Sequence, residues 1–584
     1  MNLKSEIFDA TTTRPRFSLW YFFKSYWKNS SKAGNIFLII VMALTGILQV
    51  FSLVAFNYWT KFFFDALQTY ETKKMLMLVI SFFILTLVTS GAFALNNYFS
   101  GFFSLKWRIY LTNDIKTRWL NNSRYDRLQI QNHLDNPEQR ISDDLNSLPQ
   151  LTITIANQVF QSIITLAAFT YQLWSLSEIW VMKINDQVIH FSGIYLWVTL
   201  LNALFFNIMI FKFGHNLINL NYFNQKLTAN FRYIMSLIRE HSRKILLQEF
   251  ANYHQEKTSA DFASVVKNSL AILRLDRLIS FIRQFCTGAA GVTAQLVALP
   301  AYFIGHLQVG YIMQVGSSSF MLTQALIVLV LAYESVAQLR ASQLRTSELL
   351  DKLDRLPANE QPANPIMFHQ KNGISLSNIK IFTPDNRELI SLEKLYISAN
   401  QKQLFLGKTG SGKSILLQTL VGHYLHFTGN LTLPTDFNYQ YIPQDPFLPN
   451  EDLFTLLTIY STKEIHHHKA IAALEKTGLL HLSDQLLTVG KIWQKLLSIS
   501  EKQKLCLAQA LLAQPAFLFI DNSDMFLDKE NANCFTGCIQ QLTSTTVIVS
   551  ANSANYMDCF DNVHELSISS ELIVENKYDI ECEI

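Results

Sequence analysis

Charged residues are scarce in this chain. Lys, Arg, Asp and Glu make up only 16% of its 584 residues, whereas a soluble protein normally carries about a quarter. Hydrophobic residues make up 49%, and 43 residues are phenylalanine. The shortage of charge argues against a wholly soluble protein and predicts that part of the chain faces lipid.

The formal net charge is small as well. A net charge of +3 gives no reason to expect a nucleic acid as a partner. The six cysteines show no metal-ligand spacing, and Cys534 and Cys538, which share a predicted helix face, are interpreted as buried thiols in a reducing cytoplasm. The N-terminus is polar and basic, so no cleavable signal peptide is expected.

Six stretches are long and apolar enough to cross a bilayer, which takes about 20 mostly apolar residues. The two longest connections are polar and basic, whereas the alternate connections 176–189 and 305–310 together carry only Lys183. The positive-inside rule therefore predicts a multi-pass protein with both long loops and both termini in the cytoplasm. The basic, aromatic stretch from Arg16 to Lys28 favours an interfacial helix before the first span. The predicted spans are residues 36–57, 75–97, 152–175, 190–213, 281–304 and 311–335.

A soluble part follows the membrane part. Hydropathy drops after Leu356, and residues 356–372 contain three prolines, as expected of a linker. Beyond it, short apolar runs alternate with helical patterns, which is typical of an α/β domain. The predicted organisation is an N-terminus with an interfacial helix (1–35), a transmembrane domain (36–355), a linker (356–372) and an α/β domain (373–584).

The α/β domain contains a complete phosphate-binding loop. The pattern G-x-x-x-x-G-K-[ST] is matched at every fixed position, after an apolar strand and before an apolar helix. Its glycines let backbone N–H groups approach phosphates, its lysine neutralises phosphate charge, and its final hydroxyl can bind Mg²⁺. The predicted ATP-binding residues are Gly407, Lys408, Thr409, Gly410, Ser411, Gly412, Lys413 and Ser414.

A second apolar strand, Phe517 to Ile520, ends in Asp521. A carboxylate at the end of such a strand suits the Mg²⁺ shell, as in a Walker B strand. Alone this is weak evidence, but after a phosphate-binding loop it supports a Mg–ATP site.

Residues 373 to about 567 resemble an ABC ATPase. Tyr441 to Gln444 is similar to the Q-loop, and Leu497 to Glu501 stands at the signature position. The resemblance implies that Gln444 contributes to catalysis and Mg²⁺ binding. It also implies nucleotide contacts from Ser498, Ser500, Glu501 and Asp528, the last at the end of a D-loop, and a switch position at Asn552. Phe382 is predicted either to stack on adenine or to serve as a plain core residue.

The membrane half resembles the SbmA/BacA-like uptake proteins, their ATPase-bearing relatives and the peroxisomal fatty-acyl transporters. The matching segments begin at Asn57, Trp107 and Leu134. The stretch from Asp135 to Asp144 is the most specific, and in the family it lies near the cytoplasmic contact with the nucleotide domain. The resemblance implies a six-span membrane domain of the type IV exporter fold, joined to a P-loop ABC nucleotide-binding domain.

The hydrolysis machinery departs from the family pattern at three points. Asn522 stands where the family has the glutamate base, and an amide cannot accept a proton. Ile499 and Ser500 replace the two signature glycines. Asn552 replaces the switch histidine and cannot titrate near neutral pH. ATP binding and ATP turnover are therefore separate predictions: binding intact, hydrolysis slow or absent.

Three functions remain open from the sequence. The first is a carrier of peptide-like or other bulky hydrophilic solutes that binds ATP but hydrolyses it poorly. The second is a proton-driven importer with ATP as a regulatory ligand, for which Glu334, Asp276 or Asp65 would be the titrating group, although each also fits an interfacial charge. The third is an ordinary ATP-driven exporter. For each of these functions, we expect the protein to be a homodimer embedded in the lipid of a bacterial inner membrane.

Overall fold

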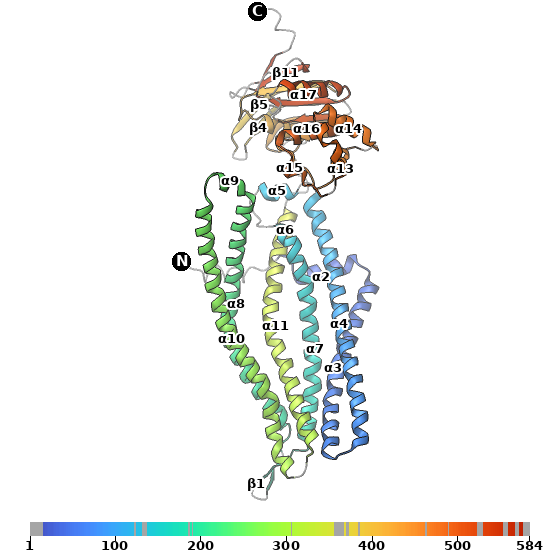
Figure 1. The fold of residues 1–584 in the computed structure, drawn as a ribbon, viewed down its shortest axis with the longest axis vertical. Coiled ribbons are helices and arrows are strands. Elements are labelled where there is room, and N and C mark those ends of the chain that lie inside the picture. Colours follow the sequence, from blue (N-terminus) through green and yellow to red (C-terminus); the bar gives the residue numbers. More distant parts are fainter. Residues whose placement is uncertain are drawn as a thin grey trace, which may run out of the picture. The chain divides into compact units, whose positions relative to one another are not determined.

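The computed structural model divides the chain into two compact units, Met1–Leu356 and Pro357–Ile584. Figure 1 shows long helices in the first unit and mixed helices and strands in the second. The structure describes residues 16–121, 124–130, 137–180, 182–184, 187–189, 191–304, 307–355, 367–369, 373–383, 386–461, 464–488, 490–521, 529–552, 559–566 and 572–575.

The first unit is a bundle of long helices. A short antiparallel hairpin, β1 (Met182–Ile184) and β2 (Gln187–Ile189), lies at the opposite end of the bundle from α9 (Figure 1). The helices are α2 (Leu19–Asn29), α3 (Lys32–Gln68), α4 (Thr72–Leu120), α5 (Arg124–Ile130), α6 (Pro137–Gln139), the π-helical η2 (Arg140–Asp144), α7 (Leu145–Ser177), α8 (Ile194–Glu240), α9 (Ser242–Leu247), α10 (Ala251–Phe303) and α11 (Val309–Arg355).

Each predicted span overlaps a different long helix. Over the described residues, five helices are long and apolar enough to cross a membrane: Lys32–Gln68, Thr72–Leu120, Pro137–Ser177, Ala251–Phe303 and Val309–Val328. In α8 the described apolar part is Ile194–Phe205, which is shorter than a span. The structure thus gives five candidate spans, and a six-span domain stays a prediction.

The aromatic stretch before the first span forms α2, which is capped by the Ser18 side chain. Phe22 and Tyr26 are buried, and the Tyr26 ring stacks on that of Trp107 in α4 at 6.1 Å. The opposite face carries Trp20, which is 66% exposed. This helix is therefore packed on the bundle along one face, and its place at a membrane surface stays a prediction.

The family-specific stretch before α7 is tied to the last turns of α11. Arg345 donates to both carboxylate oxygens of Asp144, at 2.8 and 2.6 Å, and Asp144 is only 5% exposed. Arg140 donates to the Arg345 backbone oxygen at 3.0 Å and to Glu348 at 2.8 Å. These ion pairs join the start of α7 to the end of α11, whereas residues 135 and 136 of the same stretch lie outside the described residues.

Asp65 of α3 has a structural task at the start of α11. Its carboxylate accepts a hydrogen bond from the Gly310 backbone N–H at 2.9 Å, and Gln68 accepts one from Val309 at 2.9 Å. The first N–H groups of a helix have no partner within it, so these side chains satisfy them. Of the other acidic residues considered for proton coupling, Asp276 is exposed and the side chain of Glu334 lies outside the described part.

Gly310→Ala is expected to destabilise the first unit. A Cβ at this position would lie 2.1 Å from the Lys61 backbone oxygen and 2.4 Å from an Asp65 oxygen, so α3 and α11 would have to separate. Overpacking of this kind typically costs about 1–3 kcal/mol. We expect a lower thermal unfolding midpoint in detergent. Gly101→Ala, where a Cβ meets no atom of the described residues within 4 Å, should cause no such loss, and equal midpoints for the two variants would contradict the account.

Over its described residues, the second unit contains two sheets and several short helices. Its strands are β3 (Met367–His369), β4 (Ile374–Phe382), β5 (Glu388–Ile397), β6 (Lys402–Gly407), β7 (Phe427–Pro434), β8 (Tyr439–Ile442), β9 (Phe517–Ile520), β10 (Thr546–Ala551), β11 (Asn562–Leu566) and β12 (Leu572–Glu575). Its helices are α12 (Lys413–Leu420), α13 (Leu453–Thr458), α14 (His467–Lys476), the 3₁₀ turn η3 (Leu480–Gln485), α15 (Trp493–Leu496), α16 (Ile499–Ala513) and α17 (Lys529–Gln541).

The larger sheet positions the predicted nucleotide site. Its strand order is β12-β11-β6-β10-β9-β8, and all neighbours are parallel except β11 and β12. Successive residues of β6 pack into opposite cores: Leu404 joins the cluster under α16, and Phe405 joins the cluster under α12. The smaller sheet has the order β3-β7-β4-β5. β3 falls within the predicted linker.

A buried histidine links two strands of the larger sheet. His564 Nε2 of β11 lies 2.7 Å from Gln403 Oε1 of β6, and the His564 ring stacks on Phe405. Burial lowers the pKa of His564 to about 4. Between about pH 4 and the ordinary histidine pKa of 6.5, His564 therefore binds a proton more readily in the unfolded chain than in the folded one.

The second unit should accordingly lose stability as the pH falls from about 6.5 to about 4, by about 3 kcal/mol from this residue. Thermal unfolding followed at several pH values measures the effect. His564→Gln should flatten the dependence, whereas His468→Gln, at an exposed position, should leave it as in the wild type. An unchanged slope in His564→Gln would show that this residue does not cause the pH dependence.

Candidate functional site

The predicted phosphate-binding loop lies between β6 and α12. Gly410 and Gly412 have φ angles of +89° and +88°, which favour glycine, and Gly412 caps α12. A Cβ on Gly407 would lie 2.7 Å from Ser411 Oγ and 2.8 Å from the Leu566 backbone oxygen. Because these positions lack side chains, the backbone N–H groups at the start of α12 can surround an anion.

The lysine of the loop is folded over it. Lys413 is 7% exposed, and its ammonium group donates to the backbone oxygens of Gly407 at 2.6 Å and Lys408 at 3.0 Å. It also donates to Asn552 Oδ1 at 2.8 Å. The residue at the switch position is thus joined directly to the phosphate-binding lysine, through a neutral oxygen.

The two residues predicted to bind Mg²⁺ from the loop and from the second strand lie together. Ser414 Oγ donates to Asp521 Oδ1 at 2.9 Å, and Asp521 is 6% exposed. Ser550 of β10 donates to the same oxygen at 2.9 Å. A hydroxyl and a carboxylate are hard oxygen ligands, so this pair fits Mg²⁺.

Tyr441 completes the surroundings of Asp521. Its hydroxyl donates to Asp521 Oδ2 at 3.2 Å. Burial raises the pKa of Tyr441, and the neighbouring carboxylate adds to the shift, so this hydroxyl keeps its proton. Sequence reasoning missed Tyr441 and Ser550 as partners of Asp521, because a hydroxyl in a strand carries no motif.

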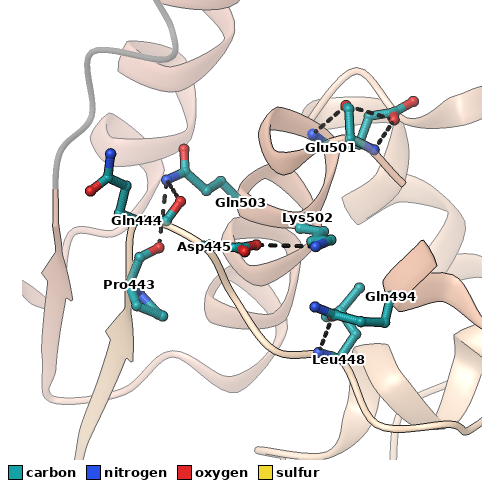
Figure 2. A network of polar contacts seen from close by, with 9 residues as sticks. Pro443, Gln444, Asp445, Leu448, Gln494, Glu501, Lys502 and Gln503 are labelled. Carbon is teal, nitrogen blue, oxygen red and sulfur yellow. Dashed lines mark hydrogen bonds and ion pairs between the residues drawn. The ribbon is translucent and has the colours of Figure 1, made fainter. Parts of the chain in front are cut away.

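Gln444 lies at the same edge of the sheet as Asp521. The Asp521 backbone N–H donates to the Ile442 oxygen at 2.9 Å, and Gln444 follows two residues later with an exposed side chain. Its backbone oxygen accepts a hydrogen bond from Gln503 (Figure 2). The backbone of the segment that carries Gln444 is therefore bonded, two residues earlier, to the strand end that carries Asp521.

The signature segment forms the start of α16. Ser498 accepts a hydrogen bond from the Glu501 N–H at 3.3 Å, and the Glu501 carboxylate accepts one from the Ser498 N–H at 2.9 Å. This capping box lowers the pKa of Glu501, chiefly through the Ser498 backbone bond. Ile499 is 39% exposed at the first helical position, where its side chain projects from the segment. Ser500 is half-buried.

The remaining predicted site residues are placed as follows. Phe382 ends β4 and is half-buried; its backbone bonds to His426 and to the Tyr424 hydroxyl, and it belongs to neither hydrophobic core of the unit. Its stacking on adenine stays a prediction. Asn522 and Asp528 lie outside the described residues.

Comparison with known proteins bears on both units. Residues 27–303 match the family description "ABC transporter transmembrane region 2", and residues 393–524 match "ABC transporter". The predicted combination of a membrane region and a P-loop ABC domain is thereby confirmed.

Three relatives are similar to this chain along most of their length. The Inner membrane ABC transporter ATP-binding protein YddA of Escherichia coli is 24% identical over 554 residues, which cover 93% of this chain and 96% of that protein. The ABC transporter D family member 2, chloroplastic, of Arabidopsis thaliana is 24% identical over 580 residues, covering 87% and 80%. The human Lysosomal cobalamin transporter ABCD4 is 23% identical over 485 residues, covering 76% and 77%.

Proposed function

We propose that this chain, an ABC transporter with a membrane region and an ATP-binding domain, carries a peptide-like or other bulky hydrophilic solute across a bacterial inner membrane. We also propose that it binds ATP but hydrolyses it slowly or not at all. Slow hydrolysis is supported most directly by the contact between Asn552 and Lys413. A neutral amide oxygen lies 2.8 Å from the ammonium group, at the position where the family has a titratable histidine.

The residues present fit ATP and Mg²⁺. The loop from Gly407 to Ser414 would hold the phosphates, and Ser414, Asp521 and Gln444 would hold the metal. A bound Mg²⁺ would neutralise phosphate charge. Lys413 and the backbone N–H groups at the start of α12 would orient the anion, and Tyr441 and Ser550 would keep the Asp521 carboxylate in place through their hydrogen bonds.

Other residues of the predicted site are poorly suited to ATP hydrolysis. Asn522, which follows Asp521 in the sequence, cannot act as a general base, a loss that typically costs about 10²–10⁴ in rate. At the signature position, Ile499 presents a large side chain where the family has glycine, and the Ser498 hydroxyl is engaged in the helix cap. All the changes affect turnover more than the phosphate cradle.

The working unit is proposed to be a homodimer of six-span subunits with cytoplasmic termini. In ABC ATPases the nucleotide lies between the phosphate-binding loop of one domain and the signature segment of another. A homodimer would carry the same substitutions in both sites, so neither site would rescue the other.

The solute class rests on resemblance and on one relative's name. The resemblance is to the SbmA/BacA-like branch, and the human relative is named a cobalamin transporter; cobalamin is itself a bulky polar molecule. The relative from E. coli is named an inner membrane protein, which supports the proposed membrane.

Steady-state phosphate release by the purified full-length protein in nanodiscs tests the proposal. We expect a rate close to that of Lys413→Ala, which serves as the background, although the wild type binds ATP. Rapid ATP-dependent release in the wild type alone would favour an ordinary ATP-driven exporter. Solute uptake into proteoliposomes driven by a pH gradient without ATP would favour the proton-driven importer.

A further inference from the structure

The segment that follows β8 is tied to α16 by side chains outside the ATP-site motifs. Gln503 Nε2 donates to the backbone oxygens of Gln444 at 2.9 Å and of Pro443 at 3.5 Å. Lys502 Nζ lies 3.0 Å from Asp445 Oδ1. Figure 2 shows these contacts next to one another at the start of α16. Three consecutive residues of the segment are therefore held by two consecutive residues of one helix.

Both helix residues are buried although both are polar. Gln503 is 1% exposed and Lys502 is 6% exposed. Burying an amide or an ammonium group is unfavourable unless the group is paired, so helix packing alone would favour apolar side chains at these positions. Their contacts with residues 443–445 give a reason for polar side chains at these two positions.

The held backbone determines where the Gln444 side chain can go. Its carbonyl group faces Gln503, whereas its side chain points away from Gln503 (Figure 2). Two residues earlier, the Ile442 oxygen accepts the backbone N–H of Asp521. The segment is thus fixed at one end by the strand that carries Asp521 and at the other by α16.

We propose that Gln503 and Lys502 are positioning residues that orient Gln444 for Mg²⁺ in the ATP site. The proposal rests on the proposed function, in which Ser414, Asp521 and Gln444 hold the metal. Because α16 begins at the signature position, the same contacts make Gln444 and the signature segment move together.

Gln503→Leu tests this inference, since leucine keeps the approximate size and burial but cannot donate. The measurement is binding of a fluorescent ATP analogue to full-length protein across a Mg²⁺ titration and in EDTA. We expect the Mg²⁺ concentration for half-maximal binding to rise about tenfold, the effect of one well-placed hydrogen bond, with unchanged binding in EDTA. Asp445→Asn removes the charge but keeps a side-chain oxygen that can accept from Lys502, and it should give a smaller shift in the same direction.

Gln509→Leu is the matched control. Gln509 lies on the same helix, is 4% exposed, and donates to the Leu456 backbone oxygen at 2.8 Å. It has the same side chain, similar burial and the same type of bond, but its partner Leu456 belongs to α13 and not to the segment 443–445 that contains Gln444. The Mg²⁺ requirement should stay as in the wild type even if this variant unfolds at a lower temperature.

A double-mutant cycle with Gln444→Ala separates positioning from a general structural role. If Gln503 acts through Gln444, the double variant should have the Mg²⁺ requirement of Gln444→Ala alone. Additive shifts, an equal loss of binding in EDTA, or an unchanged Mg²⁺ requirement in both Gln503→Leu and Asp445→Asn would overturn the inference. Failure of the wild type to bind ATP at any Mg²⁺ concentration would instead refute the proposed function.

Discussion

Lys413→Ala is expected to weaken ATP binding by about 100-fold. The ammonium group of Lys413 lies within the phosphate-binding loop, where it contacts two backbone oxygens and Asn552. Hydrogen bonds to a charged group contribute about 1.5–3 kcal/mol, and each 1.4 kcal/mol corresponds to about tenfold in affinity. Alanine removes the charge but leaves the backbone N–H groups of the loop, so residual binding should remain measurable in an equilibrium titration of the purified protein.

Lys408→Ala provides the control for charge alone. Lys408 belongs to the same loop but its side chain is exposed, and its predicted contribution is through the backbone. Its replacement should change affinity by no more than about threefold, as exposed charges contribute little. Binding by Lys413→Ala as tight as by the wild type would show that the loop does not hold phosphate.

Asn522→Glu is expected to raise ATP turnover by about 100-fold. This is the lower end of the range that a general base contributes, because Ile499, Ser500 and Asn552 would remain unchanged. Adding Asn552→His to this variant should raise the rate further. Phosphate release at saturating ATP measures both effects, with the affinity for ATP determined separately.

Two other replacements at the same position sharpen this test. Asn522→Gln has nearly the shape of glutamate without its basic carboxylate, so it should stay as slow as the wild type. Asn522→Ala should also change little, because no base is lost. Fast ATP turnover by the wild type that is lost in Asn522→Ala would mean that the amide itself supports catalysis, which contradicts the proposal of slow hydrolysis.

The sequence predicted those parts of the site that depend on local spacing. The loop from Gly407 to Ser414 needs a strand before it and a helix after it, and both are present. The strand ending at Asp521 pairs with β10, which pairs with β6, and this order brings Asp521 within 2.9 Å of Ser414. These sequence motifs predict the site correctly because the parallel sheet places the ends of its strands side by side.

Contacts between distant segments could not be predicted in the same way. Asp144 and Arg345 are 201 residues apart, and Gln503 and Gln444 are 59 apart. Neither pair has a spacing that distinguishes it from other polar residues. The place of Asp65 next to a span makes it a candidate for proton coupling, whereas its contact with the Gly310 N–H depends on how α3 packs against α11.

Hydropathy could not predict the full lengths of the long helices either. The fifth predicted span covers residues 281–304, but α10 begins at Ala251. The first half of α10 is polar, so a search for apolar stretches does not detect this part of the helix. The same is true of α11, which continues past the predicted span to Arg355.

We propose above all that this chain holds ATP without consuming it. The most direct measurement is the identity of the bound nucleotide after the purified protein has been incubated with radiolabelled ATP and Mg²⁺, freed of unbound nucleotide and denatured. The account predicts that the released nucleotide is mostly ATP in the wild type and mostly ADP in Asn522→Glu. Mostly ADP bound to the wild type would contradict it.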